Sequence, residues 1–117
     1  MPDLKRVPFD VHVSVTGQNK KDYAGVFSWY RRTIGDIPLI AAEVSRLMGG
    51  QPMNGGTMGN VVQMMAELNV VTDKGPAWWN PDTLCDEKVL VGVYGKYAEW
   101  RDNFFREEAG ETAPDTQ

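Results

Sequence analysis

Residues 7–15 read VPFDVHVSV, with an apolar side chain at every odd position. Asp10, His12 and Ser14 alternate with these side chains and point to the other side of an extended chain. A period of two with β-branched residues is typical of a strand that buries one face. The stretch therefore predicts a strand near the N-terminus whose valines face a core.

A second strand is predicted directly after a polar turn. The turn TGQNKKD occupies residues 16–22, and the run YAGVFSWYRR follows at residues 23–32. In that run Tyr23, Phe27 and Trp29 fall on one face. The two runs predict an antiparallel hairpin. Because a lone hairpin is only marginally stable in water, its apolar face must pack on other elements.

Two helices are predicted in the middle of the chain. Asp36 is a candidate N-cap for the first helix, and Gly49 with Gly50 is a candidate C-cap. The second helix is expected to start near Thr57 and to carry Glu67 opposite its apolar stripe. The apolar positions of the two helices are Ile37, Ile40, Ala41, Val44, Leu47 and Met48, followed by Met58, Val61, Val62, Met65, Leu68 and Val71.

A third helix is predicted to carry the broadest apolar face. Thr83 with Asp86 approximates a capping box, which predicts a start near Thr83 and places Cys85 in the first turn. Gly92 and Gly95 each lower the helix propensity by about 1 kcal/mol relative to alanine. Either another element crosses closely there, or the glycines are simply tolerated. The apolar face consists of Leu90, Val93, Tyr94, Tyr97, Trp100 and Phe104.

The order of the elements is strand, strand, helix, helix, helix. This order predicts an α+β fold, in which an N-terminal antiparallel β-hairpin packs on a small three-helix bundle. A chain of 117 residues fits one domain, which we expect to comprise residues 1–106. The polar, acidic residues 107–117 are predicted to form a disordered tail.

Bulk composition argues against several classes of protein. The net charge of −4 and the pI of about 4.9 disfavour direct contact with nucleic acid. No apolar run approaches the roughly 20 residues that span a bilayer, and the N-terminus lacks the apolar core of a signal peptide. A single cysteine allows no intrachain disulfide and fits a reducing compartment, although it leaves pairing between chains open. We therefore expect a cytoplasmic protein without a membrane partner.

The sequence offers no catalytic constellation. His12 is the only histidine and has no evident nucleophile to activate. Cys85 precedes Asp86 and Glu87, whose charges oppose formation of a thiolate. The neighbouring carboxylates lack the spacing of a calcium loop, and GGQPMNGGTMGN at residues 49–60 lacks the ending of a phosphate-binding loop. We expect no catalytic residue, metal ion or cofactor, and a protein that is not an enzyme.

Two adjacent tryptophans raise the question of a protein partner. The stretch GPAWWNPDTL at residues 75–84 places Trp78 and Trp79 between two prolines. Neighbouring side chains of an extended segment diverge, so one ring can fill the core while the other stays near the surface. Monomers rarely expose so much apolar area without a use. Partner contact and purely internal packing are both open. The candidate partner-binding residues are Trp78, Trp79, Met64, Met65, Tyr23 and Trp29.

Three stretches carry a resemblance to a known group of proteins. They are DYAGVFSWYRR at residues 22–32, GDIPLIAAEVSRLMGG at residues 35–50 and GPAWWNPDTLCDEKVLVGVYGKYAEW at residues 75–100. Together they resemble small tailed-bacteriophage morphogenesis proteins, and among these the tail assembly chaperones, over about residues 9–105. The N-terminal hairpin departs from the mostly helical chaperones. The resemblance implies an assembly protein that has no catalytic residues.

Three functions are expected, in order of preference. The first is a non-enzymatic phage assembly protein in the host cytoplasm, which binds exposed apolar segments of tail proteins. The second is a structural virion component of the neck, tail or capsid, in which the hairpin adds a strand to a neighbour. The third is a small acidic inhibitor of a host nucleic-acid-binding protein. The expected partners are phage tail or other virion proteins, and a homo-oligomer is open.

Overall fold

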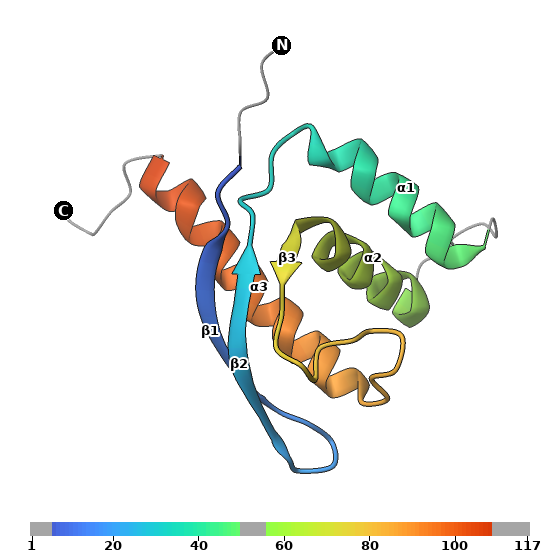
Figure 1. Ribbon diagram of the computed structural model, residues 1–117. Coiled ribbons are helices and arrows are strands. Elements are labelled where there is room, and N and C mark those ends of the chain that lie inside the picture. The colour runs from blue at the N-terminus through green and yellow to red at the C-terminus, as the bar shows by residue number, and fades with distance from the viewer. Residues whose placement is uncertain (1–5, 50–55, 109–117) are drawn as a thin grey trace.

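The computed structural model describes residues 6–49 and 56–108 of the chain. Its elements are β1 (Phe9–Thr16), β2 (Asp22–Trp29), α1 (Asp36–Met48), α2 (Gly56–Val71), β3 (Thr72–Lys74) and α3 (Glu87–Glu108), as Figure 1 shows. This confirms the predicted α+β class, with an N-terminal antiparallel hairpin packed against helices. None of the helices in the described ranges is both long and apolar enough to cross a membrane.

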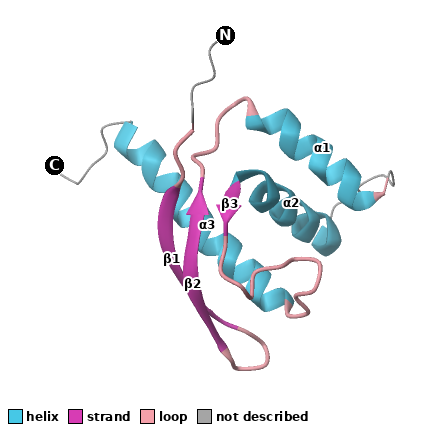
Figure 2. Cartoon of the chain, viewed as in Figure 1, coloured by secondary structure: helices cyan, strands magenta, loops and turns pink. Residues whose placement is uncertain are grey.

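The sheet has one more strand than the hairpin prediction. β1 and β2 are antiparallel, in a register that runs from Phe9 opposite Trp29 to Thr16 opposite Asp22. β3 pairs with β2 on the other side, so the strand order is β1-β2-β3 and β1 lies at an edge (Figure 2). The amide of Tyr30 also donates to the carbonyl of Val71, at 2.8 Å. This bond ties the end of α2 to the end of β2, where β3 begins.

The core lies between the sheet, α2 and α3. The alternation is confirmed from Val11 to Val15, because Val13 and Val15 are buried and His12 and Ser14 are exposed, whereas Phe9 is 44% exposed. Val7 precedes the strand and is exposed, so the buried face begins later than the sequence pattern suggested. The buried members of the core are Val13, Val15, Phe27, Trp29, Leu68, Val71, Val89, Leu90, Val93 and Tyr97.

α3 packs against β1 and approaches it closely at Gly92. A Cβ atom added to Gly92 would lie 2.9 Å from Cγ1 of Val15, which is closer than two carbon atoms normally approach. The close crossing that the sequence left open is therefore present at Gly92. Gly95 has nothing within 4 Å of the same position, so its glycine is not required by packing.

The predicted N-cap of the first helix, Asp36, is wrong, because Gly35 occupies the N-cap position. α1 begins at Asp36 itself after Gly35, and the buried Asp36 carboxylate accepts hydrogen bonds from the Thr33 amide and from Arg6. At its other end, Gly49 adopts a left-handed conformation with φ of 62°, which confirms the predicted C-cap.

The predicted capping box of the third helix is wrong. α3 begins at Glu87, and Oδ1 of Asp86 accepts a hydrogen bond from the Lys88 amide at 3.1 Å. Asp86 alone thus caps the helix, while Thr83 lies in a preceding turn and Cys85 lies before the helix instead of in its first turn. α3 continues to Glu108, two residues into the predicted tail, and residues 109–117 lie outside the described residues.

Candidate partner-binding surface

The two tryptophans of the connection before α3 are both half-buried. Trp78 donates from Nε1 to the carbonyl of Ala24 at 3.0 Å, and its ring meets Tyr23 edge-on with 5.3 Å between centroids. Trp79 packs edge-on against Phe27, also at 5.3 Å. Phe27 is fully buried, so the two indoles together close one side of the core. Much of their apolar area is therefore used inside the molecule.

The segment before α3 that carries the tryptophans fits against β2 because β2 has a glycine where this segment crosses it. A Cβ atom at Gly25 would lie 2.6 Å from Cβ of Pro76 and 3.6 Å from Nε1 of Trp78. The missing side chain therefore admits the segment that carries both tryptophans. The spacing of Tyr23, Gly25, Phe27 and Trp29 on one strand face already contained this signal.

The other predicted contact residues occupy different surroundings. Trp29 is fully buried against Tyr97 and Trp100, so its ring is covered by the core. Met65 is half-buried and packs against the core, and Met64 is half-buried. The structure thus brings Tyr23, Trp78 and Trp79 together beside Phe27, and Phe27 in turn packs against the buried Trp29. Partner contact by the six candidate residues stays a prediction.

A second exposed apolar region lies on α1 and just before it, and no sequence pattern predicted it. Ile34 is 85% exposed just before the helix, and Ile37 and Leu39 are 54% and 56% exposed within it. α1 packs mainly against α2, so its other sides have little cover (Figure 1). The sequence signal that could have indicated this exposed region was Leu39, because it falls outside the helical stripe formed by Ile37, Ile40 and Val44.

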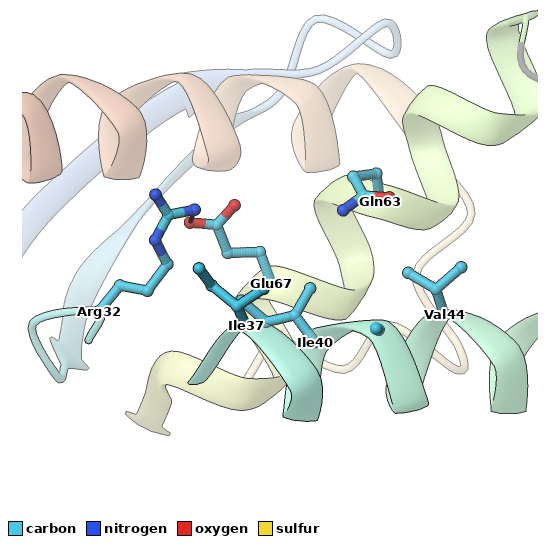
Figure 3. Close-up of a pocket in the computed structure, with 7 residues that line it drawn as sticks. Arg32, Ile37, Ile40, Val44, Gln63 and Glu67 are labelled. Carbon is cyan, nitrogen blue, oxygen red and sulfur yellow. Dashed lines mark hydrogen bonds and ion pairs between the residues drawn. The ribbon is translucent and has the colours of Figure 1, made fainter. Parts of the chain in front are cut away.

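A cleft lies between α1 and α2 on one side of their contact. Its volume is about 270 Å³, and its lining residues are Arg32, Ile37, Ile40, Ala41, Val44, Gln63 and Glu67. Figure 3 shows the aliphatic side chains rising from α1, with Gln63 and Glu67 on the α2 side. Arg32 and Glu67 point toward each other at one end. The α1–α2 cleft therefore combines an apolar wall with one ion pair.

Glu67 is buried, which contradicts its predicted place on the polar side of the second helix. Its exposed fraction is 4%. Its Oε2 accepts from Tyr97 at 2.7 Å, from Arg101 at 2.9 Å and from Arg32 at 3.1 Å, and its Oε1 accepts from Tyr94 at 3.1 Å. The carboxylate is tolerated because α3 supplies three of these donors and the segment between β2 and α1 supplies Arg32.

The hydroxyls around Glu67 are held in their neutral form. Burial raises the pKa of Tyr97 far above its ordinary value, and the hydrogen bond to Glu67 raises it further. Burial also raises the pKa of Tyr94. Neither hydroxyl is therefore poised to lose a proton near neutral pH. The Glu67 cluster, defined as Glu67, Arg32, Tyr94, Tyr97 and Arg101, is built to satisfy a buried charge.

The described residues hold no group of three or more His, Cys, Asp or Glu side chains that could bind a metal ion. His12 lies exposed on β1, beside a shallow hollow shared with Lys96 and Glu99 of α3. Cys85 is exposed, and its thiol donates to the carbonyl of Thr83. The surface around Trp78 and Trp79 and the surface on α1 both offer apolar contact, and the α1–α2 cleft adds the charged pair of Arg32 and Glu67 at one end.

A comparison with models of protein families found no match. Comparisons with curated proteins and with solved structures also found none.

Proposed function

We propose that this protein acts by binding another protein, as a bacteriophage assembly factor of the tail assembly chaperone kind. It would hold an apolar segment of a tail protein in the host cytoplasm until that segment is built into the tail. The resemblance of residues 22–32, 35–50 and 75–100 to such proteins supports the assignment. Adaptable apolar contact is the only chemistry that this function needs.

One observation carries the proposal: Ile34 just before α1, and Ile37 and Leu39 within it, are each more than half exposed, and Ile37 also lines the α1–α2 cleft. Fully burying an exposed large aliphatic side chain contributes roughly 1.5–3 kcal/mol, so a surface that leaves these three side chains more than half exposed gains from a partner. The net charge of −4 helps to keep such a protein soluble while the apolar surface is free. Both properties suit a protein that binds an unassembled subunit and releases it later.

The proposal is tested by capture of defined proteins. The tagged chain is co-expressed with the tail-tube protein or the tape-measure protein of the same phage, and the purified complex is weighed by native mass spectrometry. We expect one of the two to co-purify, and we expect the chain to slow assembly of the free tail protein in a sedimentation assay. Failure to capture either protein would remove the proposal.

A pair of variants tests the surface itself. Ile37→Asp places a charge on the wall of the cleft, whereas Val91→Asp places one on α3 at a valine that is also partly exposed, at 45%. We expect Ile37→Asp to abolish capture and Val91→Asp to preserve it, with both variants folded by circular dichroism. Equal capture by the two variants would show that α1 is not the binding surface.

The position of β1 favours a second candidate, a structural virion component. Among the described strands β1 pairs only with β2, so its outer edge is available for a strand from a neighbour (Figure 2). Mass spectrometry of purified particles separates the candidates. A virion component is present in a fixed number of copies per particle, whereas an assembly factor is absent.

A further inference from the structure

The two charged side chains that line the α1–α2 cleft are not equivalent. The Glu67 side chain is only 5% exposed and already accepts four hydrogen bonds, three of them from Tyr94, Tyr97 and Arg101 of α3. The Arg32 side chain is 30% exposed. In the described part of the chain, the bond from its Nη1 to Glu67 is the one hydrogen bond that its guanidinium makes.

This difference decides which charge the cleft can accept. A guanidinium carries five N–H donors, so Arg32 keeps several for a ligand. Glu67 keeps little capacity for an incoming cation, and Arg101 compensates its charge from the α3 side, although Arg101 also pairs with Asp102. The other carboxylates near α1 have partners of their own, because Asp36 pairs with Arg6, and Glu43 pairs with Arg46.

The size of the cleft limits what can enter beside Arg32. A volume of about 270 Å³ is just below the roughly 300 Å³ at which pockets for drug-sized ligands begin. It suits one large side chain of a protein. The wall that this side chain would meet consists of Ile37, Ile40, Ala41 and Val44, all aliphatic.

We propose that the α1–α2 cleft takes one apolar side chain of the partner protein together with an adjacent carboxylate, which pairs with Arg32. This inference rests on the proposed function and specifies the partner's docking segment. The segment carries Asp, Glu or a chain-terminal carboxylate next to a large aliphatic residue. Arg32 selects the acid because a planar guanidinium binds a carboxylate through two parallel hydrogen bonds.

Three small probes test the selection directly on the full chain. N-acetyl-L-leucine carries a carboxylate, N-acetyl-L-leucinamide is neutral, and L-leucinamide carries an ammonium group. Each is titrated into ¹⁵N-labelled protein while the amide resonances of Ile37, Ala41 and Gln63 are followed. We expect the acid to shift these resonances and to bind about tenfold more tightly than the amide, because a hydrogen bond to a charged group is stronger than a neutral one. Equal affinity of acid and amide, or tighter binding of the ammonium probe, would overturn the inference.

Two variants locate the effect. Arg32→Gln should reduce the affinity for the acid to that for the amide, and Arg32→Lys should restore part of it. Arg46→Gln removes an exposed arginine of α1 outside the cleft and should leave the acid affinity unchanged. A loss of acid selectivity in Arg46→Gln as large as in Arg32→Gln would contradict a local pairing.

The same variants separate this inference from the function on which it rests. If Arg32→Gln captures the tail protein as well as the wild type does while Ile37→Asp fails, the protein-binding function stands and the carboxylate pairing is wrong. If Ile37→Asp also captures the tail protein, the assignment of the surface itself is wrong. Weakened capture by Arg32→Gln that Arg32→Lys restores supports both.

Discussion

The hydroxyl of Tyr97 lies 2.7 Å from Oε2 of Glu67, in a contact between α3 and α2 where both residues are buried. Removing the carboxylate would leave Arg32 and Arg101 without their shared anion. We expect Glu67→Ala to lower the free energy of unfolding by roughly 3 kcal/mol, as is usual when one partner of a buried ion pair is deleted. Glu67→Gln should cost less, because its amide oxygen still accepts hydrogen bonds. Urea denaturation measures both, and an unchanged midpoint for Glu67→Ala would contradict a structural role.

Stability at alkaline pH should depend on Tyr97. The unfolded tyrosine loses its proton near pH 10, whereas the folded one retains it because burial and the bond to Glu67 raise its pKa. The unfolded state then binds fewer protons than the folded state, so stability is complete below about pH 10 and falls as the pH rises above it.

We expect Tyr97→Phe to be less stable at pH 7 by about 1 kcal/mol, through the lost hydrogen bond. We also expect its stability to decline less steeply than that of the wild type above about pH 10, because the linked proton is gone. Urea titrations at several pH values from neutral to alkaline measure the slope. Parallel curves for the two proteins would exclude a contribution from Tyr97.

The two glycines of α3 should respond oppositely to alanine. Gly95→Ala fills open space on a helix and should raise the free energy of unfolding by about 1 kcal/mol. Gly92→Ala presses a methyl group against Val15, a stiff β-branched side chain, and should lower it by roughly 1–2 kcal/mol. Each of the two variants is the control for the other, and thermal and urea denaturation measure the stability of both. Stabilisation by both substitutions would disprove the close crossing.

The tryptophans of the connection should contribute unequally to stability. Trp78 adds a hydrogen bond to Ala24 and contacts with Tyr23 and Phe27, so Trp78→Ala should cost about 3 kcal/mol. Trp79→Ala should cost less, since its indole has no hydrogen bond among the described residues. The two melting temperatures test the order. Repeating the tail-protein capture well below both melting temperatures shows whether either ring also touches the partner.

Local sequence patterns were sufficient for most of the architecture. The alternation in residues 7–15 and the matching face of residues 23–29 specify the hairpin, because a strand with one buried face needs a period of two. The stripe ending in Phe104 specifies α3 in the same way. β3 could not be predicted, since Thr72, Asp73 and Lys74 show no apolar alternation. They form a strand because the end of α2 delivers them to the free side of β2.

The Glu67 cluster shows why helix patterns alone missed the candidate site. A single-stripe interpretation assumes that a helix has one buried side and one wet side. α2 contacts α1 on one side and α3 on another, so its position opposite the main stripe is also covered. The donors for Glu67 come from residues 27 to 35 positions away in sequence, and only the tertiary fold brings them near it.

α1 is held chiefly by α2, and its first turn is held by Asp36, whose carboxylate pairs with Arg6 from the segment before β1. Because α1 contacts chiefly one other element, it is expected to open on its own while the sheet and α3 remain folded. Its amides should then exchange with deuterium well before those of the core strands. Such local opening would let an occupant enter and leave the cleft without unfolding of the sheet or α3.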